Sequence, residues 1–87
     1  MVSITQINNL INDLENEVTP QSVEYTFIHN EKLDTLFWYK NCNQLRTDEE
    51  VKNKIKRYTE ECILLNEHDL FYRGKQERIK ILKSLLS

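Results

Sequence analysis

The chain has 87 residues and a mass of 10.5 kDa, with 12 Lys and Arg against 14 Asp and Glu and a formal net charge of −2. This length excludes a multidomain enzyme and predicts one small domain over residues 1–87. Hydrophobic residues make up 39% of the chain and aromatic residues 9%, which is too much apolar material for a disordered chain, so we expect it to fold. A domain of this size buries only about 60–65% of its unfolded surface, which leaves oligomerisation open as a source of stability.

The first ten residues, MVSITQINNL, contain neither the basic region nor the apolar region of a secretory signal. The two cysteines, Cys42 and Cys62, lie twenty positions apart, so we expect a reduced, cytoplasmic protein. The longest apolar runs have four residues each, far below the roughly 20 needed to span a bilayer. The sequence therefore predicts no membrane span.

A first helix is predicted over residues 4–16. Ser3 and Gln6 have the spacing of a capping box, in which each side chain bonds to the other residue's backbone N–H. Apolar residues follow at helical spacing, at Ile4, Ile7, Leu10, Ile11 and Leu14. We expect the helix to end before Thr19 and Pro20, because the residue before a proline avoids helical angles.

Residues 22–40 favour a β-hairpin. Val23, Tyr25 and Phe27 alternate with polar residues, as in a strand with one buried face. A second group of β-branched and aromatic residues follows a polar stretch, at Thr35, Phe37, Trp38 and Tyr39. The alternative is a helix that begins at Thr19 with Pro20 in its first turn, followed by a second helix through Leu33, Leu36 and Phe37.

A second capping box, Thr47 with Glu50, predicts a helix over residues 48–66. Its apolar residues repeat in a 4-3-4-3 pattern, at Val51, Ile55, Tyr58, Cys62 and Leu65. This seam predicts packing of helix on helix, either within the chain or in a homodimer formed through these five residues. The pattern covers only two heptads, which is too short to decide between packing within the chain and a homodimer.

The last helix is predicted over residues 69–86, and Gly74 interrupts its pattern as a bend, a cap or a close backbone contact. The predicted fold class is therefore α+β and mainly helical, in the order helix, β-hairpin, helix, helix. The alternative is an all-α bundle.

Catalytic and metal-binding patterns are not found in the sequence. The chain has no glycine-rich phosphate loop and no nucleophile elbow, and its histidines, His29 and His68, are not paired with the cysteines at zinc-ligand spacing. We therefore expect a protein that is not an enzyme and that uses no metal ion or cofactor.

Two short runs, residues 36–39 and 70–73, place consecutive bulky side chains that cannot all face a core. Aromatic residues and arginine are enriched in binding hot spots. The predicted protein-binding residues are Trp38, Tyr39, Phe71, Tyr72 and Arg73. The absence of Ala, beside nine Asn, eight Ile and eight Lys, indicates an AT-rich genome. We expect a small inhibitor or regulator from a phage or mobile element that covers the surface of a partner protein.

The alternative function is a nucleic-acid-binding regulator. Residues 1–50 hold three basic and nine acidic residues (net −6), whereas residues 51–87 hold nine basic and five acidic residues (net +4). The basic residues that could contact phosphate are Lys52, Lys54, Lys56, Arg57, Lys75, Arg78 and Lys83. Carboxylates four residues from Lys52, Lys54, Lys56 and Arg57 offset their charge, so we consider this function less favoured than protein binding.

Overall fold

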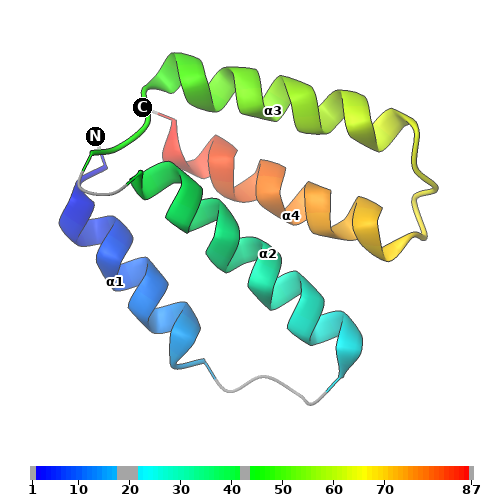
Figure 1. Ribbon diagram of the computed structural model, residues 1–87, viewed down its shortest axis with the longest axis horizontal. Helices are drawn as coiled ribbons and strands as arrows, with labels where there is room; N and C mark the ends of the chain where they lie inside the picture. Colours follow the sequence, from blue (N-terminus) through cyan, green and yellow to red (C-terminus); the bar gives the residue numbers. More distant parts are fainter. Residues whose placement is uncertain (1, 18–21, 42–43, 87) are drawn as a thin grey trace.

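The computed structural model describes residues 2–17, 22–41 and 44–86 and contains four helices (Figure 1). They are α1 (Ile4–Glu15), α2 (Val23–Lys40), α3 (Asp48–Ile63) and α4 (Leu70–Leu85). No strand occurs among the residues described, so the predicted hairpin over 22–40 is wrong and the all-α alternative fits. Thr19, Pro20 and Cys42 lie outside the described residues. None of the helices in the described ranges is long and apolar enough to cross a membrane.

Helix α2 replaces the hairpin because its ends are well capped and its apolar residues fit a helix that packs on two sides. The Ser22 hydroxyl accepts a hydrogen bond from the Tyr25 N–H at 3.1 Å, and Asn41 ends the helix in the left-handed conformation at φ 39°. The apparent alternation of residues 23, 25 and 27 has a helical explanation: Val23 and Phe27 are one turn apart on one side, and Tyr25 lies on another side. The two-helix alternative is also corrected, since α2 runs unbroken from Val23.

The helix starts predicted from capping boxes are confirmed. The Gln6 N–H donates to the Ser3 hydroxyl at 3.2 Å, and the Ser3 N–H donates to the Gln6 side chain at 2.8 Å. Thr47 and Glu50 make the same reciprocal pair at the start of α3. Helix α3 ends at Ile63, three residues earlier than predicted, and Asp69 then caps α4 by accepting from the Phe71 N–H at 2.9 Å.

The four helices form one layer in the spatial order α1, α2, α4, α3, with overall Cα dimensions of 34 × 31 × 18 Å (Figure 1). They converge at one end and spread apart at the other. We call the first the closed end; it holds the starts of α1 and α3 and the ends of α2 and α4. The open end holds the opposite ends of these helices.

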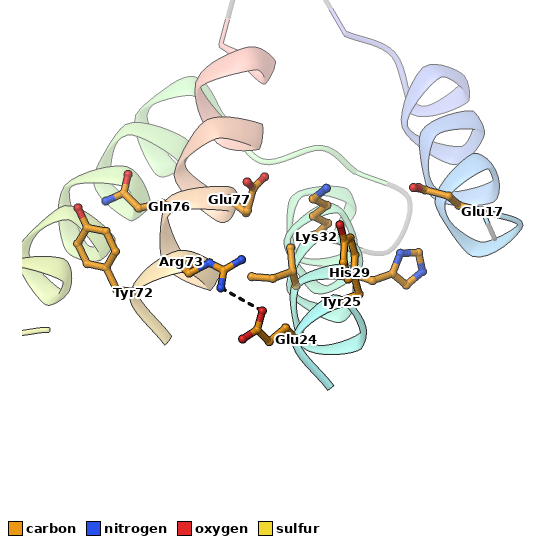
Figure 2. A pocket seen from close by; sticks show the side chains of 10 residues that line it. Glu17, Glu24, Tyr25, His29, Lys32, Tyr72, Arg73, Gln76 and Glu77 are labelled. Atoms are coloured by element: carbon orange, nitrogen blue, oxygen red, sulfur yellow. Dashed lines mark hydrogen bonds and ion pairs between the residues drawn. The ribbon is translucent and has the colours of Figure 1, made fainter. Parts of the chain in front are cut away.

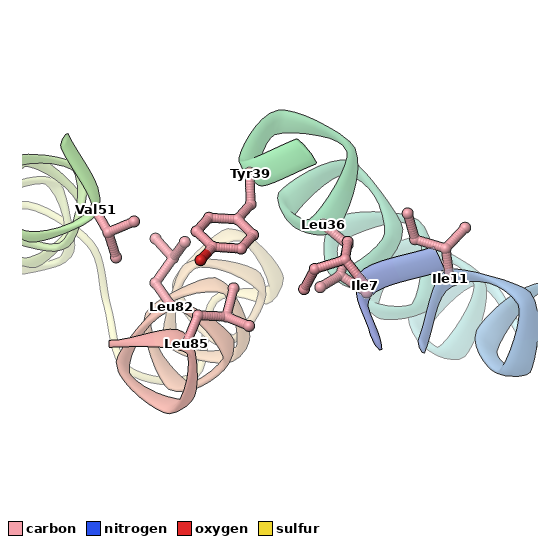
Figure 3. Close-up of a cluster of buried hydrophobic side chains, with 7 residues drawn as sticks. All are labelled: Ile7, Ile11, Leu36, Tyr39, Val51, Leu82 and Leu85. Atoms are coloured by element: carbon pink, nitrogen blue, oxygen red, sulfur yellow. The ribbon is translucent and has the colours of Figure 1, made fainter. Parts of the chain in front are cut away.

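The main apolar core lies at the closed end (Figure 3). Its buried members come from all four helices: Ile7, Ile11, Leu36, Tyr39, Val51, Leu82 and Leu85. The predicted seam of α3 contributes to the chain's own packing, since Val51 is completely buried and Cys62 is 6% exposed. A homodimer through this seam is not supported, because two of its five side chains are buried within the chain and the other three are half-buried.

Gly74 marks a close contact between α2 and α4, one of its three predicted roles. Helix α4 continues through it without a break. A Cβ atom at this position would lie 2.7 Å from Cε1 of Phe27 and 3.2 Å from Cγ of Glu31. The missing side chain thus lets the two central helices approach each other.

Candidate functional site

The five predicted protein-binding residues divide between the two ends of the molecule. Tyr39 is only 5% exposed and belongs to the core. Trp38 is partly buried, and its ring lies 4.8 Å from the Arg46 guanidinium and 5.4 Å from the Lys54 ammonium. Neither of these two aromatic rings is therefore free to insert into the surface of a partner protein. Phe71, Tyr72 and Arg73 lie together in the first turn of α4, at the open end.

Trp38 belongs to a row of alternating cations and aromatic rings that runs from α2 through α3 to α4. Lys54 lies between the rings of Trp38 and Tyr58, and 5.3 Å separates its ammonium from the centre of the Tyr58 ring. On α4, the Lys75 ammonium and the Arg78 guanidinium lie 5.2 and 5.6 Å from that ring, and Arg78 Nη1 donates to the Tyr58 hydroxyl at 3.0 Å. We call this row the cation–aromatic ladder; its members are Arg46, Trp38, Lys54, Tyr58, Lys75 and Arg78.

Carboxylates of the same chain neutralise most cations of the ladder. Arg78 donates to the Glu31 carboxylate, and Lys75 bonds to Glu61 at 2.6 Å. The hydrogen bond from Lys75 holds the pKa of Glu61 below its usual value. Two of the cations predicted to contact phosphate are thus engaged within the chain.

The other predicted phosphate contacts are dispersed. Arg57 pairs with Glu61 at 3.5 Å, as the i,i+4 spacing predicted. Lys52 and Lys56 are exposed on α3, and Lys83 is exposed near the end of α4. The structure therefore does not gather the seven basic residues into one patch.

A polar trough of about 600 Å³ lies across α2 and α4 at the open end (Figure 2). It is lined by Glu17, Glu24, Tyr25, Ile28, His29, Lys32, Tyr72, Arg73, Gln76 and Glu77. Arg73 and Glu24 form an ion pair at 3.2 Å that joins the two helices within it. We call this surface the trough.

Helical spacing explains why these residues share a face. On α2 the lining residues recur three and four positions apart, from Tyr25 to Lys32. On α4, Tyr72 and Gln76 are one turn apart, and so are Arg73 and Glu77. Lys75 of the ladder lies three positions after Tyr72 of the trough, so the ladder and the trough adjoin each other along α4.

A second, apolar hollow of about 480 Å³ lies on the other side of α2, lined by Ser22, Val23, Thr26, Phe27 and Asn30. The ring of Phe71 meets that of Phe27 edge to face, with centroids 5.4 Å apart. Val23 is 81% exposed and Phe71 is 60% exposed. We call this surface the apolar hollow.

The sequence prediction missed the contribution of α2 to both surfaces. Tyr25 and His29 in the trough, and Val23 and Phe27 in the apolar hollow, were assigned to a hairpin. Reading this segment with a period of 3.6 would have placed Tyr25 with His29 and Val23 with Phe27. The signal was therefore present, but the assumed period hid it.

The other reactive side chains that the structure describes are not gathered into one centre. Cys62 is buried, and its sulfur accepts a hydrogen bond from Gln76 at 3.4 Å. His68 is exposed beside Glu67, far along the chain from His29 in the trough. Within the described ranges, no three His, Cys, Asp or Glu side chains are placed to hold a metal ion.

Comparisons of this chain with models of protein families, with curated proteins and with solved structures found no match.

Proposed function

We propose that this protein is a non-enzymatic protein-binding module, a small inhibitor or regulator from a phage or mobile element, and that it covers its partner with the trough. The observation that carries the proposal is that Tyr25 of α2 and Tyr72 and Arg73 of α4 line one hollow, together with Glu17 beyond the end of α1. Tyrosine and arginine are enriched at the centres of protein interfaces, where they combine apolar area with hydrogen bonding.

The position of the trough on two helices also supports recognition. Sites built on helices hold their side chains more firmly than sites on loops. The close contact at Gly74 brings α2 and α4 together near the trough, and the exposed Arg73–Glu24 ion pair links the two helices within it. A partner would therefore meet a surface that is already arranged for binding, which lowers the entropic cost of association.

The lining of the trough indicates a partner segment with mixed chemistry. The lining includes the carboxylates of Glu17, Glu24 and Glu77, the cations of Lys32 and Arg73, and the apolar side chain of Ile28. Such a surface is neither the uniformly basic face that binds nucleic acid nor an apolar face for lipid. It matches the mixed composition of ordinary protein–protein interfaces.

The proposal is tested by capturing partners with the tagged full chain from lysate of its host, with and without nuclease, followed by mass spectrometry. We expect one stoichiometric, nuclease-resistant protein. Tyr72→Ala combined with Arg73→Ala should reduce its capture at least about tenfold, because hot-spot truncations each cost about 1–2 kcal/mol or more. The exposed Lys56→Ala, on α3, is the matched control and should capture as much as the wild type.

Circular dichroism of each variant shows whether the helices are retained. Equal capture by the wild type and the trough variant would contradict the proposal. Recovery of only nuclease-sensitive material would instead support a nucleic-acid-binding regulator.

A further inference from the structure

We propose that residues 4–17, which are α1 and the two residues after it, form a detachable strap. The strap opens from α2 as one unit while α2, α3 and α4 stay folded together. It carries one wall of the trough, so the use of this motion in regulation rests on the proposed function. The opening itself is a property of the free chain and is tested without a partner.

Few side chains hold α1 in place. Of its 12 residues, Ile7 and Ile11 are buried, Ile4 and Leu14 are half-buried, and the other eight are exposed. Helix α1 packs along α2, whereas α4 packs on both α2 and α3. The attachment of α1 therefore depends on one short apolar stripe and one neighbouring helix.

Polar contacts join the other three helices to one another. Arg73 of α4 pairs with Glu24 of α2 at 3.2 Å, and Lys75 of α4 pairs with Glu61 of α3 at 2.6 Å. Arg78 of α4 bonds to both α2 and α3. In the part of the chain that the structure describes, the side-chain hydrogen bonds of α1 stay within the helix and its caps, and no ion pair connects it to another helix. Opening α1 therefore breaks apolar contacts, whereas separating α4 from α2 or α3 also breaks ion pairs.

The main apolar core is divided in the same way. Figure 3 shows Ile7 and Ile11 beside Leu36 at one side of the core, and Val51 and Leu82 at the other. Val51 and Leu82 are completely buried and belong to α3 and α4, so they remain packed when α1 leaves. The released segment regains conformational entropy, and a unit with few buried contacts opens more readily than the whole chain unfolds.

Glu17 connects the strap to the trough. Its N–H donates to the Leu14 carbonyl oxygen at 3.2 Å, so Glu17 moves with the helix. Figure 2 shows Glu17 at the α1 side of the trough, with α2 between it and α4. The α2 and α4 walls stay in place when the strap opens, but the Glu17 wall is lost. The trough is therefore complete only while α1 is closed on α2.

Native-state hydrogen exchange of the full chain, followed by NMR at low concentrations of urea, tests this opening. Relative to their intrinsic rates, backbone amides in the middle of α1 should exchange at least about tenfold faster than those in the middle of α4. Their exchange should also depend less steeply on urea, because opening α1 exposes less surface than unfolding the chain. Equal relative rates and equal slopes in the two helices would overturn the proposal.

Ile11→Val and Ile79→Val are a matched pair, because each makes the same change in a side chain that is 6% exposed. Ile11 belongs to the strap, whereas Ile79 lies in α4, outside the core cluster that contains Ile11. Ile11→Val should speed exchange in α1 by about two- to tenfold. Ile79→Val should speed exchange in α4 and leave α1 unchanged, because Ile79 is packed whether the strap is closed or open.

If Ile79→Val speeds exchange in α1 as much as Ile11→Val does, the four helices open as one unit and the proposal is wrong. It is also wrong if Ile11→Val leaves exchange in α1 unchanged. These results are distinct from a failure of the proposed function. Exchange is measured on the free chain, whereas that function is tested by capture of another protein through Tyr72 and Arg73.

Discussion

The closed and open ends of this molecule use similar side chains for different purposes. At the closed end, Leu36, Val51 and Leu82 are at most 3% exposed. At the open end, five large apolar side chains face solvent, Val23, Tyr25, Ile63, Leu64 and Phe71, whereas the closed end exposes Phe37 in the last turn of α2. Because the helices form one layer and spread apart, they cannot bury side chains equally along their length. The buried side chains that stabilise the fold are therefore concentrated where the helices converge. The exposed side chains that are available for binding are concentrated where the helices separate.

The largest difference between the two ends should be seen with one substitution made at each. Leu82→Ala at the closed end should lower the free energy of unfolding by about 2–5 kcal/mol, because a completely buried leucine loses its contacts and leaves a cavity. Leu64→Ala, at a position 87% exposed, should change it by less than about 0.5 kcal/mol. Urea unfolding followed by circular dichroism measures both.

Leu64 is a matched control because it has the same side chain and ends a helix at the open end. If the two substitutions destabilise the protein equally, the conclusion that the closed end contributes more to stability than the open end is wrong.

The sequence predicted three of the four helices well: α1 and α3 at the edges of the layer, and α4 between α2 and α3. Helices α1 and α3 each contact one neighbour along most of their length, so their apolar residues fall on one stripe and capping boxes mark their starts. Helix α2 lies between α1 and α4, and its apolar residues are spread around the helix. Because α2 has no apolar stripe, its β-branched and aromatic residues led to the prediction of strands.

The binding surfaces were only partly predictable from the sequence, because some of their residues are used in contacts with residues far along the chain. Phe71, Tyr72 and Arg73 could be found because consecutive bulky residues cannot all be buried. The internal use of Trp38, Lys75 and Arg78 could not, since it depends on contacts with distant residues. The ion pair of Arg78 with Glu31, for example, joins residues 47 positions apart.

A substitution of Gly74 tests how closely α2 and α4 approach each other at the open end. Gly74→Ala gains about 1 kcal/mol of helix propensity, but its Cβ would meet the Phe27 ring at 2.7 Å. Such overpacking costs about 1–3 kcal/mol, so we expect a net loss of about 1 kcal/mol in the free energy of unfolding.

The double variant with Phe27→Ala gives the decisive comparison. Once the ring is removed, Gly74→Ala should instead stabilise the protein, by about 0.5–1 kcal/mol relative to Phe27→Ala alone. Urea unfolding of the four proteins in this cycle measures the change of sign. If alanine has the same effect with and without Phe27, the ring does not require the glycine.

The smallest effect concerns pH and compares two tyrosines, one at each end. Burial of Tyr39, with a smaller contribution from the Asp48 carboxylate, raises the pKa of its hydroxyl above the usual 10.0. Because the folded pKa lies above the unfolded pKa, the stability from neutral Tyr39 is complete below about pH 10 and is lost as the pH rises through the folded pKa. Tyr39→Phe should therefore reduce the fall in Tm between about pH 8 and about pH 11.

The control for this prediction is Tyr25→Phe at the open end, where the ring is 58% exposed. Its fall in Tm should match that of the wild type, because Tyr25 is not part of the buried core. Comparing the two falls, rather than the two values of Tm, removes any change in stability that each substitution causes at neutral pH. An equal fall in the Tyr39→Phe variant and the wild type would mean that lysines, or tyrosines outside the core, govern alkaline unfolding instead.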